Sequence, residues 1–375
     1  MLSCQDAGAL RIGIDGRELR AGIYTGIGRY VTGVLRAASR DGWPCVVYGD
    51  PATDLRATLP GVTLRVISGR WTQWWDQATL PRQLARDRVS VFLSPYYKGP
   101  LFAPCPVVLT VHDLFFIEYL GRRRPVYDAA LRTAARLYAH RAAAIIADSR
   151  YGKRAIVDRL GVAPEKVTVI PVGVGPDFRP GALSDTIRLR YGITSPYILS
   201  LGNFKPHKNL PRLLRAYAGL PEPLRATHRL VLAGGDRARR VELEHLARSL
   251  GVAAHVLFPG PIADPDLPAL YGGCALFVLP SLEEGFGLPA LEAMACGAPV
   301  VAADRAAIPE VVGAAALLVD PEHEPALTAA MARVLSEADL REQLRQRGLA
   351  RAREFSPDRT ADRVLTLLRE VGGAR

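Results

Sequence analysis

Two glutamates eight positions apart, Glu284 and Glu292, flank a loop that leads into a predicted helix. Gly285 and Gly287 lie in the loop, and Pro289 suits the first turn of a helix, where its missing N–H is not needed. The free N–H groups and the positive dipole end of a helix start bind phosphate, and carboxylates accept hydrogen bonds from hydroxyl groups. The pattern therefore fits a ligand that combines a phosphate with sugar hydroxyls. It fits two solvated surface acids equally well.

A basic loop lies earlier in the same half of the chain. Lys205, His207 and Lys208 precede a helix that is predicted to begin near Leu210. We expect at least Lys208 to reach a diphosphate, because a cation beside a helix start forms charge-assisted hydrogen bonds with phosphate oxygens.

His112 and Asp113 stand at the end of an apolar run, 107–111, that is predicted to be a buried strand. Open α/β sheets bind ligands at the carboxyl ends of their strands, which favours a functional His112. A histidine that is satisfied within the core fits the same position.

Gly26 and Gly28 lie between a strand predicted at 10–15 and an apolar-periodic helix. Glycines of this kind let the backbone approach a phosphate closely. The third glycine of the dinucleotide-binding fingerprint is missing at the required offset, so the sequence does not predict a dehydrogenase.

The elements that must position these residues alternate between strand and helix in two successive sets. Strands are predicted at 10–15, 45–48, 64–67, 89–93, 107–111, 144–147 and 167–170, and again at 197–201, 230–233, 256–258, 275–279, 299–303 and 315–319. Such alternation favours parallel sheets, and 375 residues exceed a typical single domain. We predict two α/β domains, at 1–180 and 190–354 with the linker at 176–195, and a last helix at 355–375 that starts at a Ser356-Pro357 cap.

The net charge of +11 is concentrated in one half of the chain. Residues 1–180 hold 25 Lys+Arg and 15 Asp+Glu, which gives +10 and leaves +1 for the rest. Such a field favours an anionic partner such as a membrane surface, although a general bias toward arginine explains it without any partner. Arg132, Arg136 and His140 are spaced by four on a helix predicted at 127–141 and share one face, which either lies on an anionic membrane or is simply solvated.

Other features narrow the class of protein. No apolar run reaches the roughly 18 residues of a membrane span, and the first residues lack the pattern of a signal peptide. The five cysteines form no CxxC motif, which is typical of reduced thiols in a cytoplasmic protein. Asp264-Pro265-Asp266 matches a metal-binding Asp-x-Asp by letter, but its proline favours a helix cap, so no metal site is expected.

Several motifs together resemble one family. They are TGIGRY at 25–30, SPYY at 94–97, TVHDL at 110–114, NFKPHKN at 203–209, and the pair Glu284-x7-Glu292 within EGFGLPALEAMACG. The chain resembles the retaining group 1 glycosyltransferases of the GT4 type, which include bacterial mannosyltransferases of polysaccharide and O-antigen assembly. The resemblance implies the GT-B fold, in which two Rossmann-like parallel-sheet domains face each other across a cleft and the C-terminal helix packs back on the N-terminal domain.

The resemblance also implies roles for matching positions. His112, Glu284 and Lys208 would be catalytic: His112 lines the sugar pocket, Glu284 contacts sugar hydroxyls and Lys208 neutralises the diphosphate. Glu292 would bind the ribose. The full set implied to bind the nucleotide sugar is Gly26, Gly28, Asn203, Lys205, Gly235, Asp236, Gly285, Phe286, Gly287, Leu288 and Glu292. Many relatives carry arginine where this chain has Asn203, and Lys205 or His207 is expected to compensate.

The activity that this resemblance implies is hexosyl transfer without a metal ion or other cofactor. GDP-mannose is the expected co-substrate, with UDP-glucose or another nucleotide-hexose as the alternative, and the acceptor is expected to be a glycan or a polyprenyl-diphosphate-linked glycan. The protein is expected to be cytoplasmic and peripheral on the inner face of the plasma membrane, without a nucleic-acid partner. A non-catalytic protein that binds sugar nucleotides or anionic surfaces is the alternative from another class.

Overall fold

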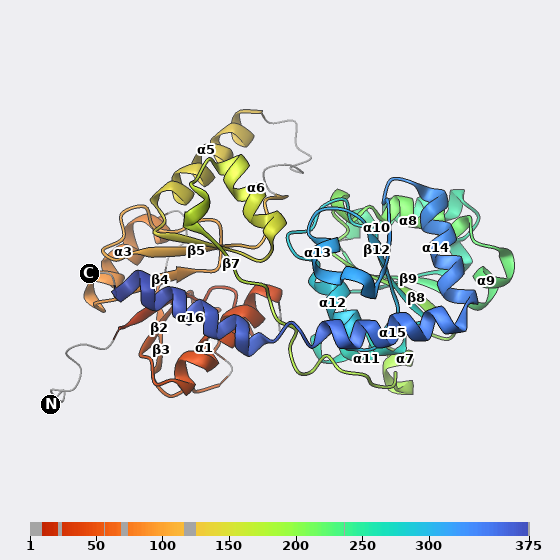
Figure 1. Cartoon of the computed structure of the whole chain (residues 1–375), viewed down its shortest axis with the longest axis horizontal. Coiled ribbons are helices and arrows are strands. Elements are labelled where there is room, and N and C mark those ends of the chain that lie inside the picture. The colour runs from red at the N-terminus through yellow and green to blue at the C-terminus, as the bar shows by residue number, and fades with distance from the viewer. Residues whose placement is uncertain are drawn as a thin grey trace. The chain divides into compact units, whose positions relative to one another are not determined.

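The computed structural model describes residues 10–21, 25–55, 57–68, 74–115, 125–235 and 237–373 (Figure 1). The chain divides into two compact units. Unit 1 comprises Met1–Gly173 and Ser356–Arg375, and unit 2 comprises Val174–Phe355. The boundary expected after residue 180 therefore lies inside unit 2, where the stretch predicted as a linker contains helix α7 (Asp185–Tyr191).

Unit 1 is built on a seven-stranded sheet whose named strands all pair in parallel. The spatial order is β3-β2-β1-β4-β5-β6-β7, so the order reverses between β1 and β4. The strands are β1 (Ile12–Asp15), β2 (Cys45–Gly49), β3 (Val62–Val66), β4 (Val91–Ser94), β5 (Val107–Val111), β6 (Ala144–Ala147) and β7 (Val167–Val169). All seven fall on or within three residues of the predicted positions, because short apolar runs bounded by turn residues are typical of buried parallel strands.

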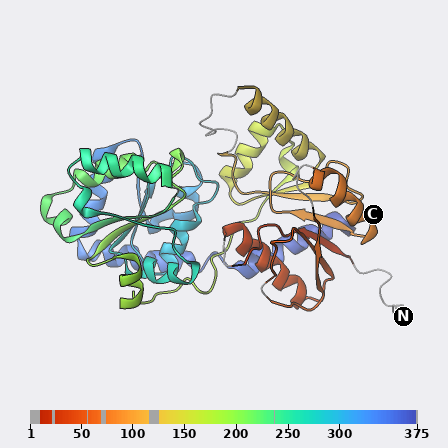
Figure 2. The same ribbon diagram turned by 180° about the vertical axis from the view of Figure 1, so that it is seen from behind.

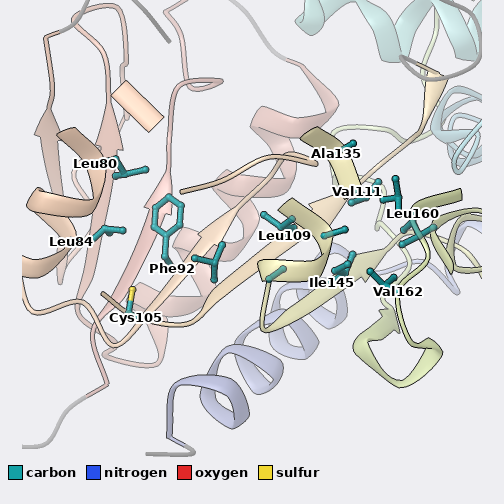
Figure 3. Packing of buried hydrophobic residues seen from close by; sticks show 14 of the residues in the cluster. Leu80, Leu84, Phe92, Cys105, Leu109, Val111, Ala135, Ile145, Leu160 and Val162 are labelled. Atoms are coloured by element: carbon teal, nitrogen blue, oxygen red, sulfur yellow. The ribbon is translucent and has the colours of Figure 1, made fainter. Parts of the chain in front are cut away.

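Helices cover both faces of this sheet, as Figure 2 shows from behind. They are α1 (Gly26–Arg40), α3 (Leu80–Arg86), α5 (Pro125–Arg141), α6 (Arg150–Leu160) and α16 (Pro357–Gly373), with a π-helical turn at Trp75–Thr79. Neighbouring strand residues point to opposite faces: Leu109 packs in a core with α3, α5 and α6 (Figure 3), whereas Val108 packs in a core with α1 and α16. Two separate apolar cores therefore fix the sheet from either side.

The last helix completes unit 1. Ser356 Oγ accepts a hydrogen bond from the Arg359 amide at 3.3 Å, and α16 then lies against α1 (Figure 1, Figure 2). Val364 and Leu368 on α16 are fully buried in the core that α1 also lines. The predicted cap and the predicted packing of the C-terminal helix on the N-terminal domain are both confirmed.

Unit 2 repeats the design with six parallel strands in the order β10-β9-β8-β11-β12-β13. The strands are β8 (Tyr197–Gly202), β9 (Arg229–Gly234), β10 (Val256–Gly260), β11 (Leu276–Leu279), β12 (Val300–Ala303) and β13 (Leu317–Val319). The order reverses between β8 and β11, which is where ligands of such sheets bind. The fold class, two Rossmann-like parallel-sheet units, is confirmed.

The helices of unit 2 follow the strands in alternation. Besides α7 they are α8 (Leu210–Ala218), α9 (Glu222–Thr227), α10 (Arg237–Ser249), α11 (Leu267–Gly273), α12 (Leu288–Ala295), α13 (Ile308–Val312), α14 (Glu324–Ser336) and α15 (Ala338–Ala352). The helix predicted around Pro289 is α12, and it ends before Gly297, whose φ is +80°. Within the described residues, no helix is long and apolar enough to cross a membrane.

Two details differ from the sequence-based expectations. Asp266 occupies the N-cap position of α11, but its carboxylate accepts no hydrogen bond from the helix: it accepts from Arg190 at 2.7 Å and from Tyr191 at 2.8 Å, and Asp264–Asp266 form a 3-10 turn. Gly26 and Gly28 form the first turn of α1 rather than a loop before it. The cysteines of the described part, Cys45 among them, are buried and free of disulfides.

Candidate functional site

Lys208 and Glu284 meet at the carboxyl edge of the unit 2 sheet. Lys208 follows β8 and Glu284 follows β11, the two neighbours between which the strand order reverses. The ammonium nitrogen Nζ lies 2.6 Å from Glu284 Oε1, and the side chains are only 11% and 8% exposed. Ser281 Oγ donates a further hydrogen bond to Oε1 at 2.7 Å. An ammonium group and a carboxylate that lie 76 residues apart in the sequence are thus held in contact.

The loop that carries Lys208 is fixed by its neighbours. Asn209 adopts a left-handed conformation with φ +56°, and its Nδ2 donates to the carbonyls of Pro280 at 3.1 Å and Pro321 at 2.8 Å. The aliphatic stem of Lys208 crosses Gly202, where an added Cβ would stand 3.2 Å from Cε. These contacts tie the ends of three strands together, so the ammonium group is held in place before any ligand arrives.

The start of α12 lies directly after Glu284. Gly287 caps the helix with φ +97°, a conformation that favours glycine, and the first turn carries no acidic residue. The Phe286 ring is buried and packs edge-on against Phe355 at 5.7 Å between centroids. Because that ring is held in the interior, the groups that the segment Gly285, Phe286, Gly287 and Leu288 can offer an anion are its backbone N–H groups.

Glu292 lies on the inner side of α12 and is 3% exposed. Its Oε2 accepts a hydrogen bond from the Tyr271 hydroxyl at 3.0 Å. The possibility of a solvated surface acid is therefore wrong for Glu292, and equally for Glu284, which is 6% exposed. A buried carboxylate needs hydrogen-bond partners, and Tyr271 supplies one of them. The ribose-binding role of Glu292 stays a prediction.

The basic loop offers fewer cations than expected. His207 is fully buried, and burial together with the neighbouring Lys208 lowers its pKa to about 4. The imidazole is therefore neutral near pH 7 and does not supply the second cation expected in place of an arginine at Asn203. Asn203 and Lys205 are exposed, and Asn203 Oδ1 accepts a hydrogen bond from the Lys205 amide at 3.3 Å.

Gly235 follows β9 with φ +76°, and an added Cβ would stand 2.2 Å from the ring of Phe204. The glycine is thus required by close packing, whatever else it binds. Asp236 lies outside the described residues.

His112 in unit 1 has a carboxylate partner. Its Nδ1 lies 2.8 Å from Asp148 Oδ2, at the carboxyl ends of the neighbouring strands β5 and β6. The Asp148 side chain is 4% exposed and that of His112 18%. Burial favours neutral His112, but the charge of Asp148 and its hydrogen bond, with Asp113 and Glu18, outweigh burial and raise the pKa of His112. Tyr30 of α1 packs edge-on against the imidazole at 5.3 Å.

Gly28 shares this end of unit 1, but its amide is already used. Thr25 caps α1, and its Oγ1 accepts a hydrogen bond from Gly28 N at 2.9 Å while donating to Glu18 Oε2 at 3.0 Å. The expected contact of Gly26 and Gly28 with phosphates stays a prediction, and the Gly28 amide would have to leave Thr25 to make it.

A second charged cluster lies at the carboxyl ends of β1 and β4, where the order of unit 1 reverses. Arg17 donates to Asp15 Oδ1 at 3.0 Å and to Asp76 Oδ1 at 2.7 Å, and Lys98 donates to Asp76 Oδ2 at 3.0 Å. The guanidinium stacks 3.9 Å above Trp75. Burial raises the pKa of Asp15, against the opposing effect of Arg17.

Sequence reasoning missed three positioning residues: Ser281, Asp148 and Tyr271. Asp148 had a signal, since it follows a strand as His112 does, and the ends of neighbouring parallel strands meet. The next residue, Ser149, caps α6, and its Oγ accepts a hydrogen bond from Gly152 N at 2.9 Å. Within the described ranges, no three His, Cys, Asp or Glu side chains converge as metal ligands.

The comparison with known proteins is consistent with this geometry. The family described as "Glycosyl transferases group 1" matches residues 185–351, and the one described as "Glycosyltransferase Family 4" matches residues 24–178. The chain is 33% identical to the serotype-specific mannosyltransferase WbdA of Escherichia coli over 270 residues, 69% of this chain and 32% of WbdA. It is 33% identical to the O-antigen chain mannosyltransferase B of Escherichia coli over 215 residues, 56% of each chain.

Among solved structures, sucrose-phosphate synthase from Thermosynechococcus elongatus shares the fold, with a TM-score of 0.80, 21% identity, and coverage of 97% of this chain and 100% of that one. The chain spans about a third of WbdA and about half of mannosyltransferase B. The two family matches together extend over both units, and the chain belongs to the group 1 glycosyltransferases of family 4.

Proposed function

We propose that this chain transfers mannose from GDP-mannose, with retention of anomeric configuration and without a metal ion, to a glycan or a lipid-linked glycan. The observation that carries the proposal is the contact between Lys208 and Glu284 beside the first turn of α12. Two relatives that are named mannosyltransferases support the choice of sugar.

The chemistry follows from the charges that develop as the bond between sugar and diphosphate breaks. The leaving diphosphate gains negative charge, which Lys208 and the N–H groups at the start of α12 stabilise. An ammonium group has three N–H donors, so Lys208 can keep its bond to Glu284 and still donate to a phosphate oxygen. Glu284 Oε1 accepts from both Lys208 and Ser281, which fixes the carboxylate for hydrogen bonds from sugar hydroxyls.

A panel of nucleotide sugars tests the proposal. GDP-mannose should raise the thermal midpoint of the full chain more than UDP-glucose or other nucleotide-hexoses do, since a ligand that binds only the native state stabilises it. Radiolabelled mannose should then appear in an acceptor glycan, and it should do so in the presence of a chelator.

Other outcomes would redirect the proposal. A larger shift with UDP-glucose, followed by glucose transfer, would replace the sugar and leave the site assignment intact. Binding without transfer or hydrolysis would favour a non-catalytic sugar-nucleotide-binding protein. If Lys208→Ala and Glu284→Ala both left transfer unchanged, the site assignment would be wrong.

A lipid-linked acceptor would place the chain at a membrane, and we propose the inner face of the plasma membrane, where the protein would be peripheral. The support is the excess of 25 Lys+Arg over 15 Asp+Glu in residues 1–180.

A further inference from the structure

Helix α5 of unit 1 exposes two of its aliphatic side chains, while two of its alanines are fully buried. Val126 is 83% exposed and Leu137 48%, whereas Ala135 and Ala139 are 0% and 1% exposed. Ala135 belongs to the same buried core as Val111, and Figure 3 labels both. A helix that only covers a soluble core places its large apolar residues inward. Packing on this core therefore does not explain the exposed Val126 and Leu137.

The exposed apolar and small residues form one stripe. Val126, Ala130, Thr133 and Leu137 are separated by four, three and four positions, the spacing at which helical residues lie above one another on one face. Phe102, 77% exposed, lies next to the end of the helix, with the Arg141 guanidinium 5.9 Å from its ring centroid.

Cations flank the stripe on both sides. Arg132, Arg136 and His140 recur every four residues along one flank, and Arg141 lies on the other. All four are exposed. Arg136 Nε donates to the Arg159 carbonyl and Arg141 Nε to the Leu101 carbonyl, both at 3.2 Å, so these two guanidinium groups are held along the edges of the stripe.

The acid content of α5 is correspondingly low. Asp128 is the one carboxylate among its 17 residues and is half-buried. An apolar centre with cationic margins and little negative charge is the composition of a helix that lies in the interface of an anionic bilayer.

We propose that the α5 face, defined by Phe102, Val126, Leu137, Arg132, Arg136 and Arg141, docks unit 1 on an anionic phospholipid surface. The apolar stripe enters the boundary between headgroups and acyl chains, and the arginines meet lipid phosphates while their stems stay on the apolar surface. A second copy of the chain would present the same cations, so like charges would oppose self-association through this face.

The α5 face would be the surface through which the protein contacts its membrane. This rests on the proposed function only in that a lipid-linked acceptor requires a membrane. The experiment therefore measures binding to lipid, which does not need catalysis. The full chain is sedimented with vesicles made of equal parts of phosphatidylcholine and phosphatidylglycerol, and with vesicles of phosphatidylcholine alone.

Two variants separate the contribution of the arginines to vesicle binding from that of the apolar side chains. R132Q/R136Q/R141Q should weaken binding to the anionic vesicles on the order of 100-fold, since each arginine near such a surface contributes about fivefold. V126S/L137S should weaken it by about tenfold and remove the residual binding at high salt, because the apolar term is not screened. Thermal denaturation of each variant shows whether the lost contacts to Arg159 and Leu101 have disturbed the fold.

Helix α10 in unit 2 supplies the matched control. It also carries exposed arginines and an exposed Val241, but Glu242 and Glu244 pair with Arg239 and Arg240. R239Q/R240Q/R248Q should bind the anionic vesicles as the unaltered chain does. Mannose transfer to a short lipid-free acceptor should be the same in all three variants.

Equal binding of the unaltered chain to both kinds of vesicle, or unchanged binding of both α5 variants, would overturn the proposal. So would a concentration-dependent dimer that the α5 variants break in the absence of lipid, since the face would then be a protein interface. Loss of mannose transfer by the unaltered chain, with vesicle binding intact, would instead refute the proposed function alone.

Discussion

The contact between Lys208 and Glu284 yields the sharpest test of the site. Replacing Lys208 by methionine keeps an unbranched stem that can pack over Gly202, but it removes the terminal ammonium group and its charge. The Glu284 carboxylate then remains in the interior with the hydroxyl of Ser281 as its remaining donor among the contacts described above.

The expected cost follows from burial. Breaking a fully buried ion pair costs about 3–5 kcal/mol, because the remaining charge is left without compensation. Here the side chains are 11% and 8% exposed and Ser281 keeps its bond, so we expect a loss of about 2–3 kcal/mol in the unfolding free energy of unit 2. For a unit of this size the thermal midpoint would fall by about 4–12 °C.

A double-mutant cycle separates this coupling from other effects of the substitutions. Lys208→Met and Glu284→Gln should each destabilise unit 2, whereas the double variant should recover about 2 kcal/mol of their sum. All three variants should lose mannose transfer by about 100-fold or more, because they remove charge stabilisation at the reacting bond. Calorimetry measures the first effect and single-turnover transfer the second.

Arg240 and Glu244 on α10 provide the control cycle. Their N–O distance is also 2.6 Å, but the side chains are 44% and 29% exposed. The coupling in R240M/E244Q should be only about 0.3–0.5 kcal/mol, with transfer unchanged. If the two cycles gave equal couplings, burial would not be the source of the interaction. If Lys208→Met retained transfer within tenfold, Lys208 would not lie at the leaving diphosphate.

Three further predictions concern other parts of the chain. Asp148→Asn removes the charge that raises the pKa of His112 in the folded protein. A raised pKa stabilises the fold at pH values below the unfolded-state pKa of about 6.5, and this stabilisation is lost as the pH rises through the folded-state pKa. The variant should therefore be more destabilised at pH 5.5 than at pH 9, and a difference in thermal midpoint that does not depend on pH would contradict this. Gly234→Ala places a Cβ 2.3 Å from a backbone oxygen at φ +97° and should lower the free energy of unfolding by about 3 kcal/mol or more. Gly251→Ala, at φ +70° with open space around the Cβ, should lower it by only about 1–2 kcal/mol, and urea denaturation measures both changes. Tyr271→Phe removes the hydroxyl that donates to the buried carboxylate of α12 and should cost about 1–2 kcal/mol; no change in urea midpoint would show that the carboxylate is satisfied without it.

Much of the fold was predictable because parallel strands are short apolar runs that end in turns. The run at 107–111 is strand β5 over the same residues, and the run at 144–147 is β6. The first turn of α12 followed from Pro289 and the glycines before it. Each of these signals is local, so one sequence is enough to read it.

The contacts that build the site are not local. Lys208 and Glu284 each had a recognisable loop, but their contact depends on β8 and β11 becoming neighbours, which the order of strands along the chain does not reveal. The sequence does not show that Glu292 is buried, because α12 is packed on nearly every side and has no amphipathic pattern that would mark one face as the inner one. The neutrality of His207 required knowledge of its burial. Tertiary packing decides all three.

Unit 1 is built from two segments that are separated in the sequence by unit 2, and this affects how the chain folds during synthesis on the ribosome. Val364 and Leu368, which fill the core under α1, belong to a helix that is translated after every residue of unit 2. Unit 2 is a continuous segment and can therefore complete its fold first, although it is second in the sequence. Until α16 emerges, the apolar face formed by Val31 and Val34 stays uncovered on that side. The nascent chain thus passes through a state in which its first-made unit is the one most exposed to aggregation and to chaperones.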